Sequence, residues 1–337
     1  MFFASDNGAT IPPDIMAAIV AANDDPSLAY GNDAATARCR DRIRQVFEAP
    51  EAEVFLLTTG TSSNCLSLAT LAPSWSTIFC HARAHIGRAE CNAPEFFTGG
   101  ASLTKIEGPH GRIEPEALAD AITRTGGAVH NPQKGALSLT NATEAGTVYD
   151  PSRLSALTAV ARDQGVPVHL DGARFANALA RTGASPAEMS WKAGIDILSL
   201  GGTKNGLMAA EAVIMFDPAK AWEFQLRRKR AGHLGSKLRY IAAQFDAWFA
   251  NDRWLTLARD ANIRATRLAK GLQDLGAEFL NPVEANVIFA LLPAEAHERA
   301  KAAGAVYYRY NDRLCRFVTG WDTSDADIDA LLAALGG

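Results

Sequence analysis

The pattern of apolar and polar positions predicts short buried strands that alternate with longer helices over the first two thirds of the chain. Apolar runs too short for helices stand between turn residues, as expected for strands that are buried on both faces of a sheet. The expected strands are Val54–Leu57, Thr77–His81, Leu137–Thr140, Val166–Leu170, Ile197–Leu200 and Val213–Phe216. Strands that alternate with helices form a mostly parallel sheet with helices on both faces, so the pattern predicts an α/β fold.

Two helices can be placed from their sequence. One is expected from about Thr61 to Leu71. The other should begin after Asp150, a favourable N-cap, with Pro151 in its first turn, and should end at Gly165.

The pattern changes after Pro218, where about fifty residues have apolar positions at helical spacing. The last part of the chain alternates short strands with two helices, which indicates a small α+β domain. We therefore expect a large domain over residues 1–242 and a small domain over residues 243–337, with a boundary near Ala242 that a long helix could span.

Composition narrows the class of protein. The chain has 337 residues and a net charge of −4, so charge gives no reason to expect a nucleic acid or a membrane surface as a partner. Its five cysteines are odd in number and form no C-x-x-C pair, which argues against a disulfide framework and against a metal site. The start does not resemble a signal peptide, and no apolar run approaches the roughly 20 residues that span a bilayer. We expect a cytoplasmic protein.

Ligands of open parallel sheets bind beyond the carboxyl ends of the strands, so the residues after each strand are the candidates for chemistry. "TTGTSSN" follows the first strand, and there Gly60, Thr61 and Ser62 begin a helix whose free N–H groups suit a phosphate. An ordinary helix cap is the alternative. His85 and Glu90 follow the second strand, although a single histidine near a loop is more often structural.

Three charged residues follow the later strands. In "PVHLDGARFAN", Asp171 ends a strand and Arg174 follows, and a guanidinium matches a carboxylate with two hydrogen bonds. A surface salt bridge between the two is the simpler alternative. Lys204 stands between glycines in "GGTKNG", where a partly desolvated lysine can become nucleophilic enough to form a Schiff base. Alternatively, Lys204 lies in an exposed glycine turn. His169 points away from the face of Asp171 and is expected to be structural.

In this order along one sheet, these residues match what pyridoxal 5′-phosphate requires. The turn at Gly60 would hold the phosphate, Asp171 would keep the pyridine nitrogen protonated, and Lys204 would hold the aldehyde. His85 could stack on the ring, which leaves Arg174 for the carboxylate of an amino-acid substrate.

The whole chain resembles the low-specificity L-threonine aldolases, in the β-eliminating-lyase branch of the fold-type I pyridoxal-phosphate enzymes. The "HLDGAR" and "SLGGTKNG" motifs together are the most specific part of this resemblance, and the other motifs and the His85/Glu90 pair support it. The motifs are "SDN" at Ser5–Asn7, "YGND" at Tyr30–Asp33, "TGTSSN" at Thr59–Asn64, "HLDGAR" at His169–Arg174, "SLGGTKNG" at Ser199–Gly206 and "RFVTGWDTS" at Arg316–Ser324.

The resemblance implies a fold-type I structure and a role for each matching residue. Lys204 would be the Schiff-base lysine and Asp171 the partner of the pyridine nitrogen. The remaining residues would bind phosphate (Gly60, Thr61, Ser62), the ring (His85) and the substrate carboxylate (Ser5, Arg174, Arg316). Family members are dimers of dimers, so a homotetramer is expected, with Tyr30 and the basic stretch at residues 227–230 reaching the site of a neighbouring subunit, where Tyr30 would contact the substrate. A solvated helix face is the alternative for the basic stretch.

The sequence departs from the commonest family pattern after the third strand. Many members carry a histidine there, whereas this chain has Thr143 in "TNATEAG". His130, upstream in "AVHNPQKG", could supply the missing imidazole, as in a branch that includes phenylserine aldolases, or it could be an exposed loop residue. The group that takes the proton from the substrate's β-hydroxyl therefore stays open between His85, His130 and a water molecule.

The resemblance implies retro-aldol cleavage of L-threonine or L-allo-threonine to glycine and an aldehyde. L-Phenylserine is an alternative substrate, and β-elimination or transamination is an alternative reaction because the cofactor-binding residues fit these equally well. A binding protein without turnover is a third reading, which the intact Lys204 and Asp171 oppose.

Overall fold

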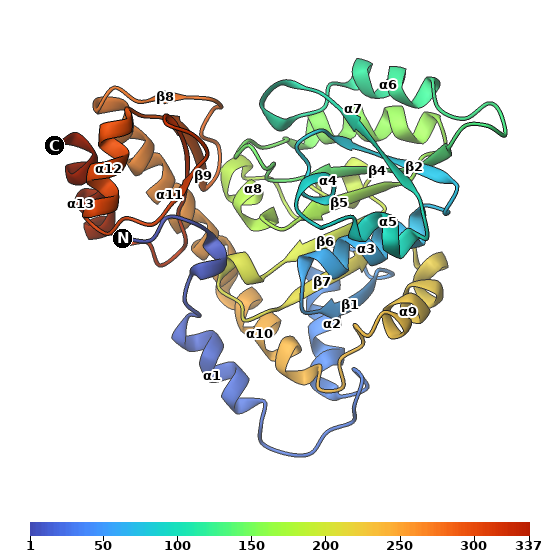
Figure 1. Cartoon of the computed structure of the whole chain (residues 1–337). Helices are drawn as coiled ribbons and strands as arrows, with labels where there is room; N and C mark the ends of the chain where they lie inside the picture. The colour runs from blue at the N-terminus through green and yellow to red at the C-terminus, as the bar shows by residue number, and fades with distance from the viewer.

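The computed structural model describes residues 1–337 and contains two sheets (Figure 1). The larger sheet has seven strands in the order β1-β7-β6-β5-β4-β2-β3. Its strands are β1 (Glu53–Leu57), β2 (Ser76–His81), β3 (Ser102–Ile106), β4 (Gln133–Thr140), β5 (Val168–Gly172), β6 (Ile197–Gly201) and β7 (Glu211–Met215). The smaller, antiparallel sheet has the order β10-β11-β9-β8, with β8 (Glu278–Phe279), β9 (Val287–Leu291), β10 (Tyr308–Arg309) and β11 (Leu314–Val318).

Strand direction places most carboxyl ends at one edge of the larger sheet. β3, β2, β4, β5 and β6 pair in parallel, while β7 is antiparallel to both β6 and β1. β1 therefore runs in the same direction as the parallel strands. The mostly parallel sheet expected from the sequence is confirmed. β3 was not expected, because it is an edge strand in which Ile106 alone is buried.

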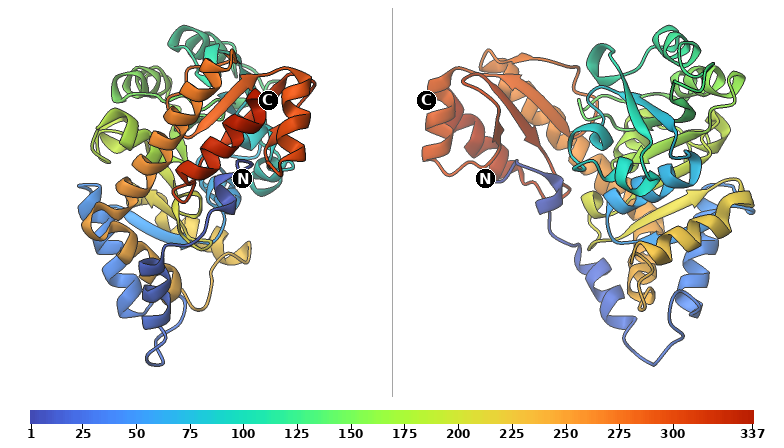
Figure 2. Two further views of the ribbon diagram at one scale, coloured as in Figure 1. Left: turned by 90° about the vertical axis from the view of Figure 1, so that its left-hand side faces the viewer. Right: turned by 45° about the vertical axis from the view of Figure 1, so that its right-hand side comes forward.

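Helices cover both faces of this sheet (Figures 1 and 2). One buried cluster packs Leu56, Leu170 and Leu198 against helices that include α2, α7, α8 and α10. A second cluster, which includes Phe55 and Val213, packs the opposite face against α3 and α9. The helices are α1 (Pro13–Ala21), α2 (Ala34–Val46), α3 (Gly60–Leu71), α4 (His85–Arg88), α5 (Ala93–Thr98), α6 (Pro115–Thr123), α7 (Pro151–Asp163), α8 (Phe175–Thr182), α9 (Ala221–Arg230), α10 (Arg239–Phe249), α11 (Arg253–Asp274), α12 (Ala294–Ala302) and α13 (Asp325–Gly336).

The ends of α7 show why its limits could be read from sequence. The side chain of Asp150 accepts a hydrogen bond from Arg153 N, and Pro151 occupies the first helical position. Gly165 lies just beyond the helix with a φ of +67°, a conformation that glycine adopts without strain. Local residues therefore determine both ends.

Helix α11 connects the two sheets. Its first turns pack Trp254 and Leu257 into the core of the large sheet, and its later turns pack Leu268 and Leu272 into a third cluster beside the small sheet. The N-terminal Phe3 also belongs to that third cluster. We therefore propose that the two domains join within α11 rather than at residue 242, and that the first residues of the chain pack with the small domain.

None of the helices combines the length and the apolar character that crossing a bilayer requires.

Candidate active site

The carboxyl edge of the large sheet gathers most of the residues expected to bind cofactor. The turn before α3 follows β1, and His85 begins α4 after β2. Asp171 is the last residue but one of β5, and Lys204 lies in the short 3₁₀ helix η4 (Thr203–Asn205) after β6. The N-terminal turn η1 (Asp6–Gly8) packs against η4. Segments far apart in the sequence thus meet at one edge.

The N-terminus of α3 is suited to hold an anion. Thr59 caps the helix by accepting a hydrogen bond from Ser62 N at 3.2 Å, and Ser62 Oγ donates to Thr59 O at 2.9 Å. Ser62 is therefore occupied within the cap, whereas the N–H groups of Gly60 and Thr61 have no acceptor in the helix. A methyl group added at Gly60 would meet no heavy atom within 4 Å, so open space lies beside Gly60 at the start of this helix.

Asp171 is a buried carboxylate held by two donors. Its Oδ1 accepts from Ala173 N at 3.1 Å, and its Oδ2 accepts from Asn64 Nδ2 at 3.2 Å. The surface salt bridge between Asp171 and Arg174, considered as an alternative, is not formed. Asp171 has no cationic partner within the protein, so its charge is available to a ligand at this edge.

Arg174 instead forms a buried ion pair with Asp6. Arg174 Nε and Nη2 donate to the two carboxylate oxygens of Asp6 at 2.6 and 2.9 Å, and Asn286 Nδ2 donates to Asp6 Oδ2 at 3.0 Å. Burial by itself would raise the pKa of Asp6, but the charges of Arg174 and Lys204 outweigh it and hold this pKa below its ordinary value. Only Nη1 of Arg174 makes no hydrogen bond within the protein, which leaves one nitrogen for a ligand.

Lys204 is half-buried and makes no hydrogen bond or salt bridge within the protein. Its charge acts on two buried carboxyl groups, Asp6 and Glu211, and favours the ionised form of each. Glu211 opens β7, where it pairs with Gly201 of β6 and Leu57 of β1. Burial raises the pKa of Glu211 to about 7, although hydrogen bonds from Thr203 and the charge of Lys204 oppose the rise. Nothing in the sequence pattern had assigned a role to either carboxyl group.

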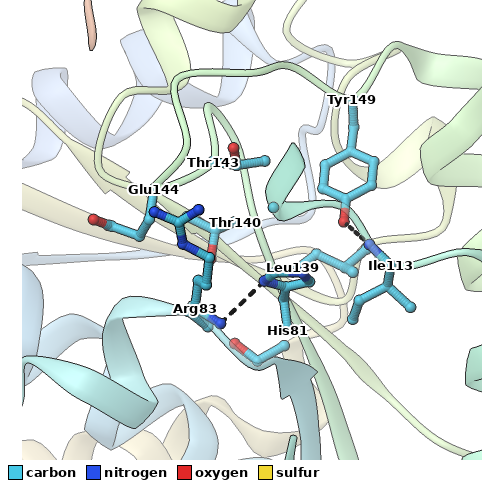
Figure 3. A pocket seen from close by; sticks show the side chains of 11 residues that line it. His81, Arg83, Ile113, Leu139, Thr140, Thr143, Glu144 and Tyr149 are labelled. Carbon is cyan, nitrogen blue, oxygen red and sulfur yellow. Dashed lines mark hydrogen bonds between the residues drawn. The ribbon is translucent and has the colours of Figure 1, made fainter. Parts of the chain in front are cut away.

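His85 and Thr143 lie after neighbouring strands, β2 and β4. His85 Nδ1 is buried and has no hydrogen-bond partner. The hydroxyl of Thr143, which stands where many family members have histidine, is 2.8 Å from Thr147 Oγ1 and accepts from Ala145 N at 3.2 Å. The hydroxyl of Thr143 thus makes its hydrogen bonds within its own loop. It lines a small pocket with Arg83, Glu144 and other residues from the ends of β2 and β4 (Figure 3).

The carboxylate-binding candidates Ser5 and Arg316 meet near the N-terminus. Arg316, on β11 of the small domain, donates from Nη2 to Ala4 O at 3.0 Å, and its Nε is buried without a partner. Ser5 follows directly, and its Oγ accepts from Asn7 N at 3.2 Å. The segment at residues 4–6 therefore contacts Arg316 on one side and, through Asp6, Arg174 on the other.

Two candidates do not join this edge in the single chain. His130 is exposed in the loop before β4, at the opposite end of an eight-residue strand that spans roughly 25 Å. Tyr30 is 48 % exposed, donates from its backbone N to Ser236 O and lies under the Lys229 ammonium, 4.9 Å from its ring centre. His130 is therefore not placed to act as a base within its own chain, and Tyr30 contacts the segment that follows α9.

The basic stretch at residues 227–230 divides into different environments. Arg228 is buried and donates from Nη2 to Leu56 O at 2.5 Å, while burial and the nearby charge of Arg40 lower its pKa to about 10. Arg40 and Arg44 donate to Val54 O and Ala52 O in the same way. Three arginines thus cover alternate carbonyl groups along the free edge of β1, which protects that edge from pairing with another strand.

Known proteins share this sequence over nearly its full length. The family model described as beta-eliminating lyase matches residues 3–295. The low-specificity L-threonine aldolase of Pseudomonas aeruginosa is 42 % identical over 95 % of this chain and 93 % of its own. The enzyme of the same name from a Pseudomonas sp. is 38 % identical over 98 % and 96 %. The chain belongs to the beta-eliminating lyases, in the low-specificity L-threonine aldolase family.

Solved structures show the same fold. A threonine aldolase of Leishmania major superposes with a TM-score of 0.93 at 23 % identity, covering 99 % of this chain and 98 % of that one. The serine palmitoyltransferase of Sphingomonas wittichii superposes with a TM-score of 0.76 at 17 % identity, covering 100 % and 86 %. The family and the fold-type I architecture expected from the sequence are both confirmed.

Enzymes of this family depend on pyridoxal phosphate, and the residues at the sheet edge fit that group. Open space lies in front of Gly60 for the phosphate, Asp171 offers an unpaired buried carboxylate, and Lys204 is free of acidic partners in hydrogen-bonding range. His85 Nδ1 is a further buried polar atom without a partner. Open space, a carboxylate without a cation, a free ammonium and an unpartnered imidazole nitrogen at one end of the sheet fit a ligand that contacts all four.

Proposed function

We propose that this chain is a pyridoxal-phosphate-dependent aldolase that cleaves an L-β-hydroxy-α-amino acid, L-threonine or L-allo-threonine, to glycine and an aldehyde. The observation that carries the proposal is the 42 % identity to a low-specificity L-threonine aldolase over 95 % of the chain. The unpaired Lys204 and Asp171 at one sheet edge support it, since a protein that had lost turnover would not need them.

Each residue would hold a different part of the cofactor. The N–H groups of Gly60 and Thr61 would bind the phosphate at the N-terminus of α3. Asp171 would accept a hydrogen bond from the protonated ring nitrogen, His85 would lie against the ring, and Lys204 would attach the group covalently. When bound, pyridoxal phosphate supplies the electron sink that carbon–carbon cleavage next to the amino group requires.

The remaining side chains act on the substrate. Nη1 of Arg174, with Arg316 and Ser5, would hold the α-carboxylate and so orient the amino acid. The imidazole at this edge belongs to His85, and we assign to it the removal of the β-hydroxyl proton. Loss of that proton turns the β-carbon into an aldehyde as the Cα–Cβ bond breaks. Return of a proton to Cα completes glycine, so atoms and charge balance.

We also propose that the active protein is a homotetramer with its sites near subunit interfaces. The helices α5 and α9 expose large apolar side chains, among them Phe96 at 78 % and Trp222 at 70 %. A groove of about 810 Å³ lies beside them and is lined partly by Phe96, Arg227 and Arg230. Exposed apolar surface of this kind is typical of subunit contacts. The cysteines form no disulfide, which supports a reducing, cytoplasmic location.

Covalent attachment of the cofactor tests the site directly. The protein is incubated with pyridoxal phosphate and reduced with borohydride, and the labelled peptide is identified by mass spectrometry. We expect the label on Lys204, and we expect Lys204→Ala to lose both the label and aldehyde release from L-threonine. Lys301→Ala, at an exposed position of α12, is the matched control and should keep both. A label on a different lysine would contradict the assignment.

A further inference from the structure

Glu90 is a buried acid that has no role in the proposed chemistry. It lies two residues beyond α4 and is 5 % exposed. A carboxyl group is seldom buried to this degree unless it is paired, and Glu90 has no cationic partner. Its contacts are with α3, on the side of that helix that also faces Asp171.

One amide connects Glu90 to Asp171. Asn64 Nδ2 donates to Glu90 Oε1 at 3.1 Å and to Asp171 Oδ2 at 3.2 Å. An amide nitrogen carries two hydrogens, so each carboxyl group receives one of them. Asn64 Oδ1 is buried and has no partner, and the amide is therefore held through its nitrogen alone. If Glu90 did not accept its hydrogen bond, Asn64 could rotate away from Asp171.

The two carboxyl groups also interact through charge. Asp171 on β5 is the charged group that faces Glu90, while Thr61, Asn64 and the Cys65 thiol face it from α3 and are neutral. Burial and the negative charge of Asp171 raise the pKa of Glu90 to about 7, because two adjacent carboxylates in a desolvated site repel each other. With a pKa of about 7, Glu90 is partly protonated near neutral pH, which weakens its repulsion of the Asp171 carboxylate.

We propose that Glu90 is a positioning residue that, through the amide of Asn64, holds the Asp171 carboxylate in the orientation that binds the cofactor's ring nitrogen. This inference rests on the proposed function, since it assigns the ring nitrogen to Asp171. It explains why the amide of Asn64 is shared between two acids although its carbonyl oxygen goes without a partner.

Cofactor affinity and a double-mutant cycle test the inference. Glu90→Ala removes the acceptor, and we expect it to weaken pyridoxal phosphate binding to the apo-protein by about tenfold or more, as for a lost hydrogen bond to a charged group. Glu90→Gln keeps an oxygen for Asn64 and should retain most of the affinity. In an Asn64→Ala background, Glu90→Ala should have almost no further effect, because the two residues act through one path. Glu107→Ala, an exposed position after β3, is the control.

Dissociation constants from equilibrium dialysis and the pH dependence of the bound cofactor's visible spectrum are the two readouts. We expect the spectrum of Glu90→Gln to change less between pH 6 and 8 than that of the native protein, in keeping with a group that titrates at about 7. Unchanged affinity and spectrum in Glu90→Ala and Glu90→Gln would overturn the inference, even if the thermal stability of these variants fell. Additive effects of Asn64→Ala and Glu90→Ala would overturn it as well. Failure of the native protein itself to bind the cofactor would instead overturn the proposed function.

Discussion

At the scale of single residues, Asp6 and Arg174 form a buried ion pair with two hydrogen bonds at the sheet edge. Both side chains are buried, and Asn286 of the small domain donates to the same carboxylate. Arg174 was expected only to bind the substrate carboxylate, but it also pairs with Asp6 within the protein. Asp6 fixes two of its nitrogens, and a guanidinium held in this way can present the third without losing further side-chain entropy.

Asp6→Asn tests this pair. It leaves the Arg174 charge buried and only partly compensated, so the free energy of unfolding should fall by about 3–5 kcal/mol in urea denaturation. The control is Asp14→Asn, which breaks a partly exposed bridge to Arg253 and should cost about 1 kcal/mol or less. Because folding lowers the pKa of Asp6, its stabilisation is present above the carboxyl's ordinary pKa and is lost as pH falls through the lowered value. Equal losses in the two variants would contradict the account.

Gly60→Ala separates cofactor binding from folding. The added methyl group meets no protein atom within 4 Å, and alanine favours a helix by up to about 1 kcal/mol, so the apo-protein should be as stable as the native protein or slightly more stable. The methyl group would project into the open space beside Gly60, where the phosphate is proposed to bind. We therefore expect weaker binding of pyridoxal phosphate, measured by dialysis. Native affinity in this variant would show that the phosphate lies elsewhere.

Local signals made some site residues predictable and left others hidden. Asp171, Lys204 and Gly60 each follow a buried strand, and the pattern around each is contained in a few residues. Asp6 has its partner 168 positions away, and Asn64 meets Asp171 across 107 positions. No short pattern encodes such contacts. The place of His130 was also hidden, since only the structure shows it before β4, at the amino end of that strand and away from the site within its own chain.

At the scale of elements, apolar runs located all six expected strands of the large sheet but not their exact limits. β5 extends through Asp171 and Gly172, two polar or small residues that the apolar run excludes. The direction of β7 was also hidden, because an apolar run reads the same in a parallel and an antiparallel strand. Helix ends with explicit caps, as in α7, were the most predictable feature.

The loop after β4 packs against the small domain, and within this loop Gly146 approaches the backbone of β9 closely. Gly146 has a φ of +80°, and a methyl group added there would lie 2.2 Å from Val287 O of β9. Gly146→Ala should therefore lower the melting temperature well beyond the effect of backbone strain alone. Gly165→Ala is the matched control, since Gly165 has a φ of +67° with no atom within 4 Å and should lose about 1–2 kcal/mol. Similar melting temperatures for the two variants would contradict this contact.

At the scale of the whole molecule, the candidate active site lies where the two proposed domains and the N-terminal segment meet. Residues 4–6 contact Arg316 of the small domain and Arg174 of the large domain. The family resemblance had placed Ser5, Arg174 and Arg316 at one carboxylate. The apolar pattern alone could not predict this arrangement, because nothing in it shows which domain the first residues join. Helix α11 holds the domains together by contributing to both cores.

Assembly is tested at the exposed apolar surface of α5. Phe96→Glu places a charge in the proposed subunit contact and should convert the native assembly to a smaller species in light scattering, since a buried unpaired charge opposes association. Val129→Glu, in a loop and 95 % exposed, is the control and should leave the mass unchanged. A native protein that is monomeric would contradict the proposed tetramer, and an unchanged mass in Phe96→Glu would contradict the placing of a subunit contact on α5.

The central claim is that the chain cleaves β-hydroxy-α-amino acids, and product analysis tests it most directly. The protein, loaded with pyridoxal phosphate, is incubated separately with L-threonine, L-allo-threonine, D-threonine and L-phenylserine, and glycine and aldehyde are quantified together. We predict equal amounts of glycine and aldehyde from at least one of the L-amino acids and none from D-threonine. Formation of a keto acid and ammonia, or conversion of the cofactor to its amine form without glycine, would contradict the account.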